Sequence, residues 1–148
     1  MSDSTSNRFD EFQKPAVANI VKDFREKPNG RFLLVIPTGG GKTRTAVKSV
    51  MALFENGVLN PETDKVLWVA HRRYLLKQAQ EDGFDEVTST VNYRGKIIFA
   101  MVGNLAKSVM DSEPNLRLIV VDEAHHSKEG NVTYRPILQN ASVGILGL

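Results

Sequence analysis

The chain has 148 residues, the size of one ordinary domain, with 41% hydrophobic side chains, 24% charged side chains and a net charge of +2. This composition excludes a disordered tail, and no apolar run is long enough to cross a bilayer. The absence of cysteine excludes disulfides, thiol catalysis and cysteine-based zinc sites. The polar first seven residues lack the pattern of a secretory signal, so we expect a cytoplasmic protein.

The spacing of apolar residues predicts alternating helices and strands. A helix is expected over residues 9–26, where apolar side chains recur near the helical period, and a buried strand over 31–36 follows the turn at Pro28-Asn-Gly30. Beyond a glycine cluster the alternation continues, with helices over 42–55, 72–82 and 104–110 and strands over 66–70, 97–100 and 116–121. In the helix over 72–82, Tyr74, Leu75, Leu76 and Ala79 are expected to point inward.

Short apolar strands that alternate with helices specify a doubly wound α/β fold. Parallel strands need crossover connections, and the crossover helices cover both faces of the sheet. We therefore expect one domain over residues 1–148, built on a mostly parallel sheet. The net charge of +2 is too small to indicate nucleic acid by itself, so function has to be argued from local groups.

The sharpest signal is the run Pro37-Thr-Gly-Gly-Gly-Lys-Thr43, between an expected strand and an expected helix. Glycines let the backbone turn its N–H groups toward an anion, and the helix N-terminus adds its dipole. Lys42 would reach the β- and γ-phosphates of ATP, and the Thr43 hydroxyl would bind Mg²⁺. An ordinary glycine-rich turn is the alternative, and Ile36 stands where the general pattern has glycine. We expect a phosphate-binding loop made of Thr38, Gly39, Gly40, Gly41, Lys42 and Thr43.

A second signal, Val120-Val-Asp-Glu-Ala-His125, stands at the end of the most apolar strand. Ligands of open α/β sheets bind beyond the carboxyl ends of the strands, so Asp122 and Thr43 can meet at one metal ion. Hydrolysis of a phosphoanhydride needs one carboxylate for Mg²⁺ and a second group to orient water, which suits Asp122 and Glu123 respectively. A zinc hydrolase using Glu123, His125 and His126 is the rival, but the H-E-x-x-H pattern is absent.

These two motifs resemble motifs I and II of superfamily 2 helicases of the DEAD/DEAH-box group, in a subset similar to the motor subunits of type I and type III restriction enzymes. The resemblance implies a RecA-like domain, the first of two, with ATP and Mg²⁺ as cofactors. It implies a nucleic acid as partner, with DNA favoured over RNA, and a role in restriction or phage defence.

Two further segments carry the resemblance. Phe12-Gln13 is similar to the segment whose glutamine reads the adenine edge, although Asp10 stands where such families usually have a basic residue. By itself, Gln13 is a polar helix residue. Residues 66–78 resemble motif Ia, in which His71, Arg72 and Arg73 form a basic group suited to nucleic-acid phosphates. The alternative for that group is a solvated basic turn.

The remaining motifs are less complete. At the next nucleic-acid motif, Met101 and Gly103 stand where threonine and glutamine are common, and the segment with Tyr93, Arg94 and Lys96 favours a surface hairpin or loop. Residues 143–148 look like the strand that leads into motif III, toward which His125 would relay the nucleotide state.

We therefore expect a fragment that stops before motif III and lacks the second RecA-like domain with its arginine finger. Such a finger contributes about 10³ to 10⁵ in rate, so little or no hydrolysis is expected from these residues alone. An attached nuclease or methyltransferase module is a further expected partner. Two alternatives stay open: a phosphate-loop ATPase that never touches nucleic acid, and a non-enzymatic module that only holds nucleotide or a partner protein.

Overall fold

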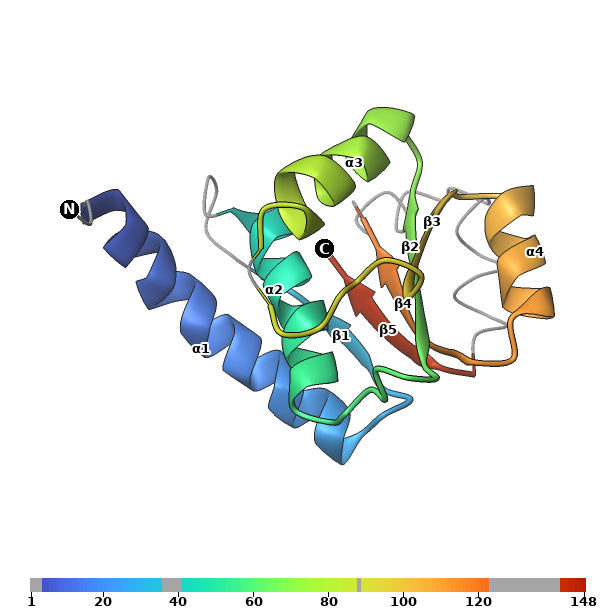
Figure 1. The fold of residues 1–148 in the computed structure, drawn as a ribbon, viewed down its shortest axis with the longest axis horizontal. Coiled ribbons are helices and arrows are strands. Elements are labelled where there is room, and N and C mark those ends of the chain that lie inside the picture. The colour runs from blue at the N-terminus through green and yellow to red at the C-terminus, as the bar shows by residue number, and fades with distance from the viewer. Residues whose placement is uncertain (1–3, 36–40, 88, 123–141) are drawn as a thin grey trace.

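A five-stranded, all-parallel sheet forms the centre of the molecule, with its strands in the order β1-β5-β4-β2-β3 (Figure 1). The computed structural model describes residues 4–35, 41–87, 89–122 and 142–148. The prediction of a doubly wound α/β domain is confirmed. The strands are β1 (Arg31–Leu33), β2 (Lys65–Ala70), β3 (Ile97–Met101), β4 (Leu116–Val121) and β5 (Gly144–Gly147).

Helices cover both faces of this sheet. Figure 1 shows α1, α2 and α3 on one side of the strands and α4 on the other. The helical segments are α1 (Ser4–Glu26), α2 (Lys42–Glu55), α3 (Arg73–Lys77), the π-helical segment η1 (Gln78–Phe84) and α4 (Asn104–Ser112). In the part of the chain described, no helix is long and apolar enough to cross a membrane.

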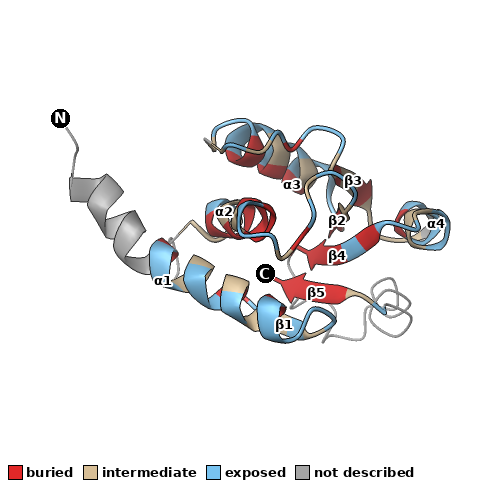
Figure 2. Cartoon of the chain, turned by 60° about the horizontal axis from the view of Figure 1, so that its bottom comes forward, coloured by how far each residue is buried: buried red, intermediate tan, exposed pale blue. Residues whose placement is uncertain are grey.

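The two faces of the sheet belong to two separate apolar clusters. Alternate residues of the central strands face opposite ways, so that Trp68 and Val120 pack with α1, α2 and η1, whereas Val69 and Val121 pack on the α4 side. All of these strand residues are at most 1% exposed, and the buried strands are visible in Figure 2. Burial on both faces explains the uninterrupted apolar runs in the sequence.

Strand β1 is shorter than predicted. Up to residue 35, where the described segment ends, pairing with β5 covers Arg31–Leu33 of the strand predicted over 31–36, and the Leu34 N–H still donates to the Gly147 carbonyl oxygen at 2.8 Å. Since β1 stands at the edge of the sheet, it is held from one side only, and Leu33 is 54% exposed.

The helix predicted over 72–82 is in fact two segments. The helix α3 widens into η1, where the Asp85 N–H donates to the Gln80 oxygen at 2.8 Å, five residues back. At Gly83 an added Cβ would lie 2.7 Å from Val47 Cγ2, so the glycine lets η1 pack against α2. The expectation that Tyr74 points inward is wrong: Leu75 and Ala79 face the core, and Tyr74 is 60% exposed.

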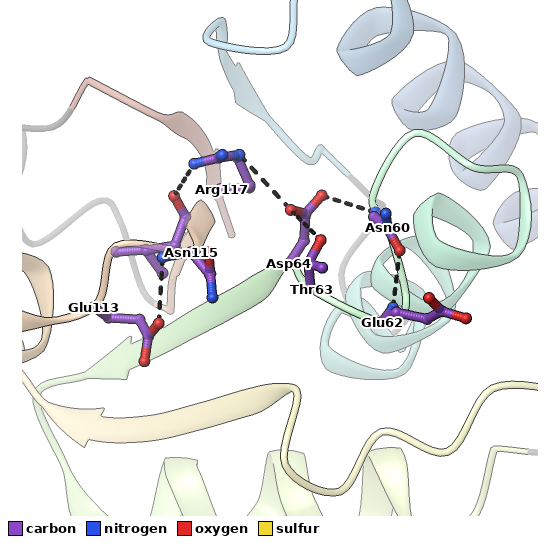
Figure 3. A network of polar contacts seen from close by, with 8 residues as sticks. Asn60, Glu62, Thr63, Asp64, Glu113, Asn115 and Arg117 are labelled. Carbon is purple, nitrogen blue, oxygen red and sulfur yellow. Dashed lines mark hydrogen bonds and ion pairs between the residues drawn. The ribbon is translucent and has the colours of Figure 1, made fainter.

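Polar contacts fasten the loops at the amino edge of the sheet (Figure 3). The Asp64 carboxylate accepts the Asn60 N–H at 2.7 Å and lies 3.7 Å from Arg117 Nε. Asn60 Oδ1 in turn accepts the Glu62 N–H at 2.9 Å, and Glu113 accepts the Asn115 N–H at 3.2 Å. These contacts tie the turn before β2 to the start of β4 and fix the amino ends of the central strands.

Tyr93 anchors the loop before β3. Its ring lies 5.0 Å from Phe84, its hydroxyl donates to the Asp85 carboxylate, and Arg94 pairs with the same carboxylate at 3.2 Å. Burial, and then the hydrogen bond to Asp85, raise the pKa of Tyr93 above the ordinary value of 10.0.

This raised pKa predicts a loss of stability at alkaline pH. Because the folded pKa exceeds the unfolded one, the phenol's contribution is complete below about pH 10 and disappears as the pH rises through the folded value. We expect Tyr93→Phe to lower the free energy of unfolding by about 0.5 to 1.5 kcal/mol at neutral pH and to flatten its decline above pH 10. Urea unfolding at a series of pH values measures both effects. Asp85→Asn should give an intermediate profile, and identical alkaline profiles for wild type and Tyr93→Phe would contradict the assignment.

Candidate functional site

The predicted site residues converge on the carboxyl edge of the sheet. All five strands are parallel, so the segment after β1, Asp122 after β4 and His71 after β2 all leave the sheet on the same side. The ends of the strands are joined by backbone hydrogen bonds, from Asp122 N–H to Val69 at 2.9 Å and from Leu148 N–H to Val121 at 3.0 Å. This edge is where ligands of open α/β sheets bind.

The last glycine of the predicted phosphate-binding loop begins α2. Gly41 has φ 71 and ψ 50, a left-handed conformation that glycine adopts without strain. Its carbonyl oxygen accepts two bonds from Thr45, from the N–H and from Oγ1, each at 2.9 Å. Thr45 is completely buried. The buried threonine thus fixes the direction from which the chain enters the helix.

Lys42 and Thr43 form the first turn of α2, and both are half-buried. The first turn of a helix presents N–H groups that its own backbone does not use, and these attract anions. Helix α2 is 14 residues long, and no acidic side chain stands in its first turn to compete for that position. Thr38, Gly39 and Gly40 lie outside the described residues.

Asp122 follows β4 directly and is only 2% exposed. Strand β5 lies between β4 and β1, and neighbouring strands are about 4.8 Å apart. The strand that leads to the glycine loop and the strand that leads to Asp122 are therefore about 10 Å apart, a separation that a Mg²⁺-bound phosphate chain can bridge. Glu123, His125 and His126 lie outside the described residues.

The basic group His71, Arg72 and Arg73 occupies the turn from β2 to α3. His71 is half-buried, and Arg72 Nε donates to its Nε2 at 3.1 Å, while Arg72 and Arg73 are exposed. Exposed arginines beside the strand that leads to Asp122 are suited to contact a phosphate backbone. The exposed ring of Tyr74 follows them in the sequence, although helical spacing predicts that Tyr74 points into the core.

The segments after β3 and before it offer little to a nucleic acid. Gly103 has φ 117 and ψ −140 where α4 begins, so this position requires glycine for its backbone and has no side chain to offer. Arg94 lies 5.3 Å from the Tyr93 ring and pairs with Asp85. The prediction of a surface loop here is confirmed, and its residues hold the loop together.

Gln13 lies within the packing of α1 against α2 and is 1% exposed. Its Oε1 accepts a hydrogen bond from Lys48 Nζ at 2.9 Å. Sequence reasoning missed Lys48, because the two residues are 35 positions apart and no motif spacing joins them. Helix α2 also carries Lys42 and Arg44, so nothing in the sequence singles out Lys48.

A comparison with models of known protein families identifies the family of this chain. Residues 7–148 match the model described as "Type III restriction enzyme, res subunit". The chain belongs to this family. A search of curated proteins found no match.

Membership in this family makes the chain an ATP-dependent, helicase-like motor domain. The family has a RecA-like fold. The suspected resemblance to restriction-enzyme motors is confirmed. Membership places the chain among helicase-type ATPases and makes a nucleic acid its expected partner class.

The oxygen atoms available at the carboxyl edge of the sheet are suited to bind Mg²⁺. Mg²⁺ prefers oxygen ligands and is commonly held by one or two carboxylates together with phosphates. The half-buried Thr43 hydroxyl and the buried Asp122 carboxylate are oxygen donors on the same edge of the sheet.

Lys42→Ala tests whether the α2 N-terminus holds phosphates. Removing the ammonium group should weaken the binding of MgATP by at least about tenfold, because a charge-assisted contact to phosphate is lost. Calorimetric titration of the chain with MgATP measures the Kd. Lys107→Ala, at an exposed lysine on α4, is the matched control and should bind as the wild type does. Equal affinity of both variants would show that the phosphates bind elsewhere.

Proposed function

We propose that this chain is the ATP-binding half of a DNA helicase or translocase, which couples ATP hydrolysis to movement on DNA. One observation carries the proposal. Strand β4, which Asp122 follows directly, is hydrogen-bonded along its length to β2, the strand followed by His71, Arg72 and Arg73. Groups suited to a nucleotide and groups suited to a nucleic-acid backbone therefore stand on adjacent strands of one rigid sheet.

Each side chain has a distinct task in this proposal. Lys42 and the loop residues Thr38, Gly39 and Gly40 bind the phosphates, while Thr43 and Asp122 hold Mg²⁺, which neutralises charge that develops on the phosphoryl oxygens. Glu123 orients the attacking water and accepts its proton. Gln13 meets the base at the far end of the nucleotide.

The neighbouring strands also supply a route for coupling. The Asp122 N–H is bonded to the Val69 carbonyl, two residues before His71. A shift of the Asp122 backbone on nucleotide binding or hydrolysis would therefore reach the basic turn through one hydrogen bond and two peptide units. Linkage makes this reciprocal: if ATP changes the affinity for DNA, DNA changes the affinity for ATP by the same factor.

Little hydrolysis is expected from the chain by itself. Motors of this kind bind ATP between two domains and close that cleft during turnover, whereas the described residues form a single sheet. A second RecA-like domain with an arginine finger is the expected partner, and a nuclease or methyltransferase module is a further one. The role in restriction or phage defence belongs to the same proposal.

ATP hydrolysis by the intact protein, with and without single- and double-stranded DNA, tests the proposal. We expect DNA to stimulate turnover and Glu123→Gln to reduce it by at least about 10²-fold while MgATP still binds, because general-base catalysis is lost. A rate of ATP hydrolysis that neither DNA nor RNA changes would favour a phosphate-loop ATPase of another class. ATP binding without any turnover would favour a nucleotide-binding module.

The double variant Arg72→Ala, Arg73→Ala tests the nucleic-acid surface. It should raise the DNA concentration needed for half-maximal stimulation, and the slope of log affinity against log salt should fall by about 0.9 for each phosphate contact removed from duplex DNA. Arg117→Ala is the matched control, because it removes an exposed arginine at the opposite edge of the sheet. An unchanged salt slope in the double variant would place the DNA on another surface.

A further inference from the structure

Tyr74 is an aromatic residue of α3 whose exposure the packing of the core does not explain. Its side chain is 60% exposed, whereas Leu75 and Ala79, which follow it, are buried. Within the described residues the Tyr74 hydroxyl makes no hydrogen bond and the ring packs on no other ring. A single exposed ring is ordinary on a protein surface, so its meaning depends on the groups around it.

Cations surround this ring in the sequence and on the helix. Arg72 and Arg73 precede it, and Lys77, three positions further on, shares its face of α3; all three are exposed. Among the described residues Arg72 donates only through Nε, to His71, so the two terminal nitrogens of its guanidinium remain as donors. No acidic residue occurs between His71 and Gln80. The surface therefore combines positive charge with one accessible aromatic side chain.

The ring also lies at the edge of the sheet where the nucleic acid is proposed to bind. Tyr74 is in the first turn of α3, which begins after the carboxyl end of β2. Proteins that hold single strands combine a positively charged surface with aromatic side chains on which bases stack. In a duplex the two faces of a base are covered by its neighbours, so only an unpaired, unstacked base can meet such a ring.

Resting on the proposed function, we propose that Tyr74 stacks on an unpaired base and gives this surface a contact with single-stranded DNA that a duplex cannot make. The arginines contact phosphates, which every nucleic acid offers, and the ring contacts the face of a base, which only an open strand offers. Every base has such a face, so stacking does not select a sequence. Tyr74 thus distinguishes the state of the strand and not its sequence.

Salt separates the two contributions. Phosphate contacts release counterions, so their removal lowers the slope of log affinity against log salt. Stacking neutralises no phosphate, so its loss leaves that slope unchanged. Tyr74→Ala should therefore weaken the binding of a single strand at every salt concentration by the same factor, whereas the double variant Arg72→Ala, Arg73→Ala should also flatten the slope.

Fluorescence anisotropy of the intact protein tests this inference with three labelled DNA probes: a single strand, the corresponding duplex, and a strand of the same length with abasic sugars throughout. Tyr74→Ala should raise the Kd for the single strand by about five- to 10²-fold, as the loss of one stacked base predicts. The Kd values for the duplex and the abasic strand should not change.

Two further variants and a folding check complete this experiment. Tyr74→Phe retains the ring and should bind all three probes as the wild type does. Leu105→Ala is the matched control, because it removes a side chain that is 64% exposed from α4, on the other face of the sheet. Circular dichroism checks that each variant is folded.

The outcomes separate this inference from the function on which it rests. An unchanged Kd of Tyr74→Ala for the single strand leaves the ring to a contact with another protein and overturns the inference alone. Equal weakening for all three probes shows a structural role or a backbone contact, and weak binding by Tyr74→Phe shows a role of the hydroxyl; either result overturns it as well. Failure of the wild type to bind any probe, or binding that the arginine double variant leaves unchanged, overturns the nucleic-acid surface and the inference with it.

Discussion

Because all five strands run parallel, each one has to return through a crossover, and each one ends at the same edge of the sheet. The chemistry of the domain depends on this constraint. It gathers the end of the glycine loop, the buried Asp122 and the basic turn after β2 from three distant parts of the sequence. The polar network around Asp64 and Arg117 occupies the other edge, where it fastens turns.

The apolar core makes that edge rigid enough for chemistry. Val120 and Val121 are fully buried on opposite faces of β4, so the strand cannot move without disturbing both layers. Asp122, the next residue, inherits this fixed position. Gly41 is held in a comparable way, because its carbonyl oxygen is bonded to the completely buried Thr45. A site on rigid elements can hold its polar groups ready for charge that develops during a reaction.

The features that follow from local periodicity could be predicted from the sequence. Helix α2 and strand β4 have the predicted bounds, 42–55 and 116–121, because a buried strand and an amphipathic helix each leave a strong pattern. Features that depend on tertiary contacts could not be predicted. The short pairing of β1, the widened turn of η1 against Val47 and the exposure of Tyr74 all follow from what packs alongside.

The candidate site shows the same division. Motif spacing indicated Lys42, Thr43 and Asp122, and the topology brings their segments to one edge. The roles of these residues stay predictions, as do those of Glu123 and the loop residues 38–40, which lie outside the described part of the chain. Lys48 left no motif at all. Its contact with Gln13 joins two helices across 35 positions of the sequence, so it belongs to the tertiary structure and not to the local pattern.

Helix α2 connects these separate contributions. Its first turn carries the residues proposed to bind phosphate, and Lys48, further along, holds the amide proposed to meet the base. Specificity is a difference between two affinities, and the phosphates of ATP and GTP are identical. The first turn can therefore supply affinity for any nucleoside triphosphate, so the choice of base has to be made by contacts elsewhere in the site.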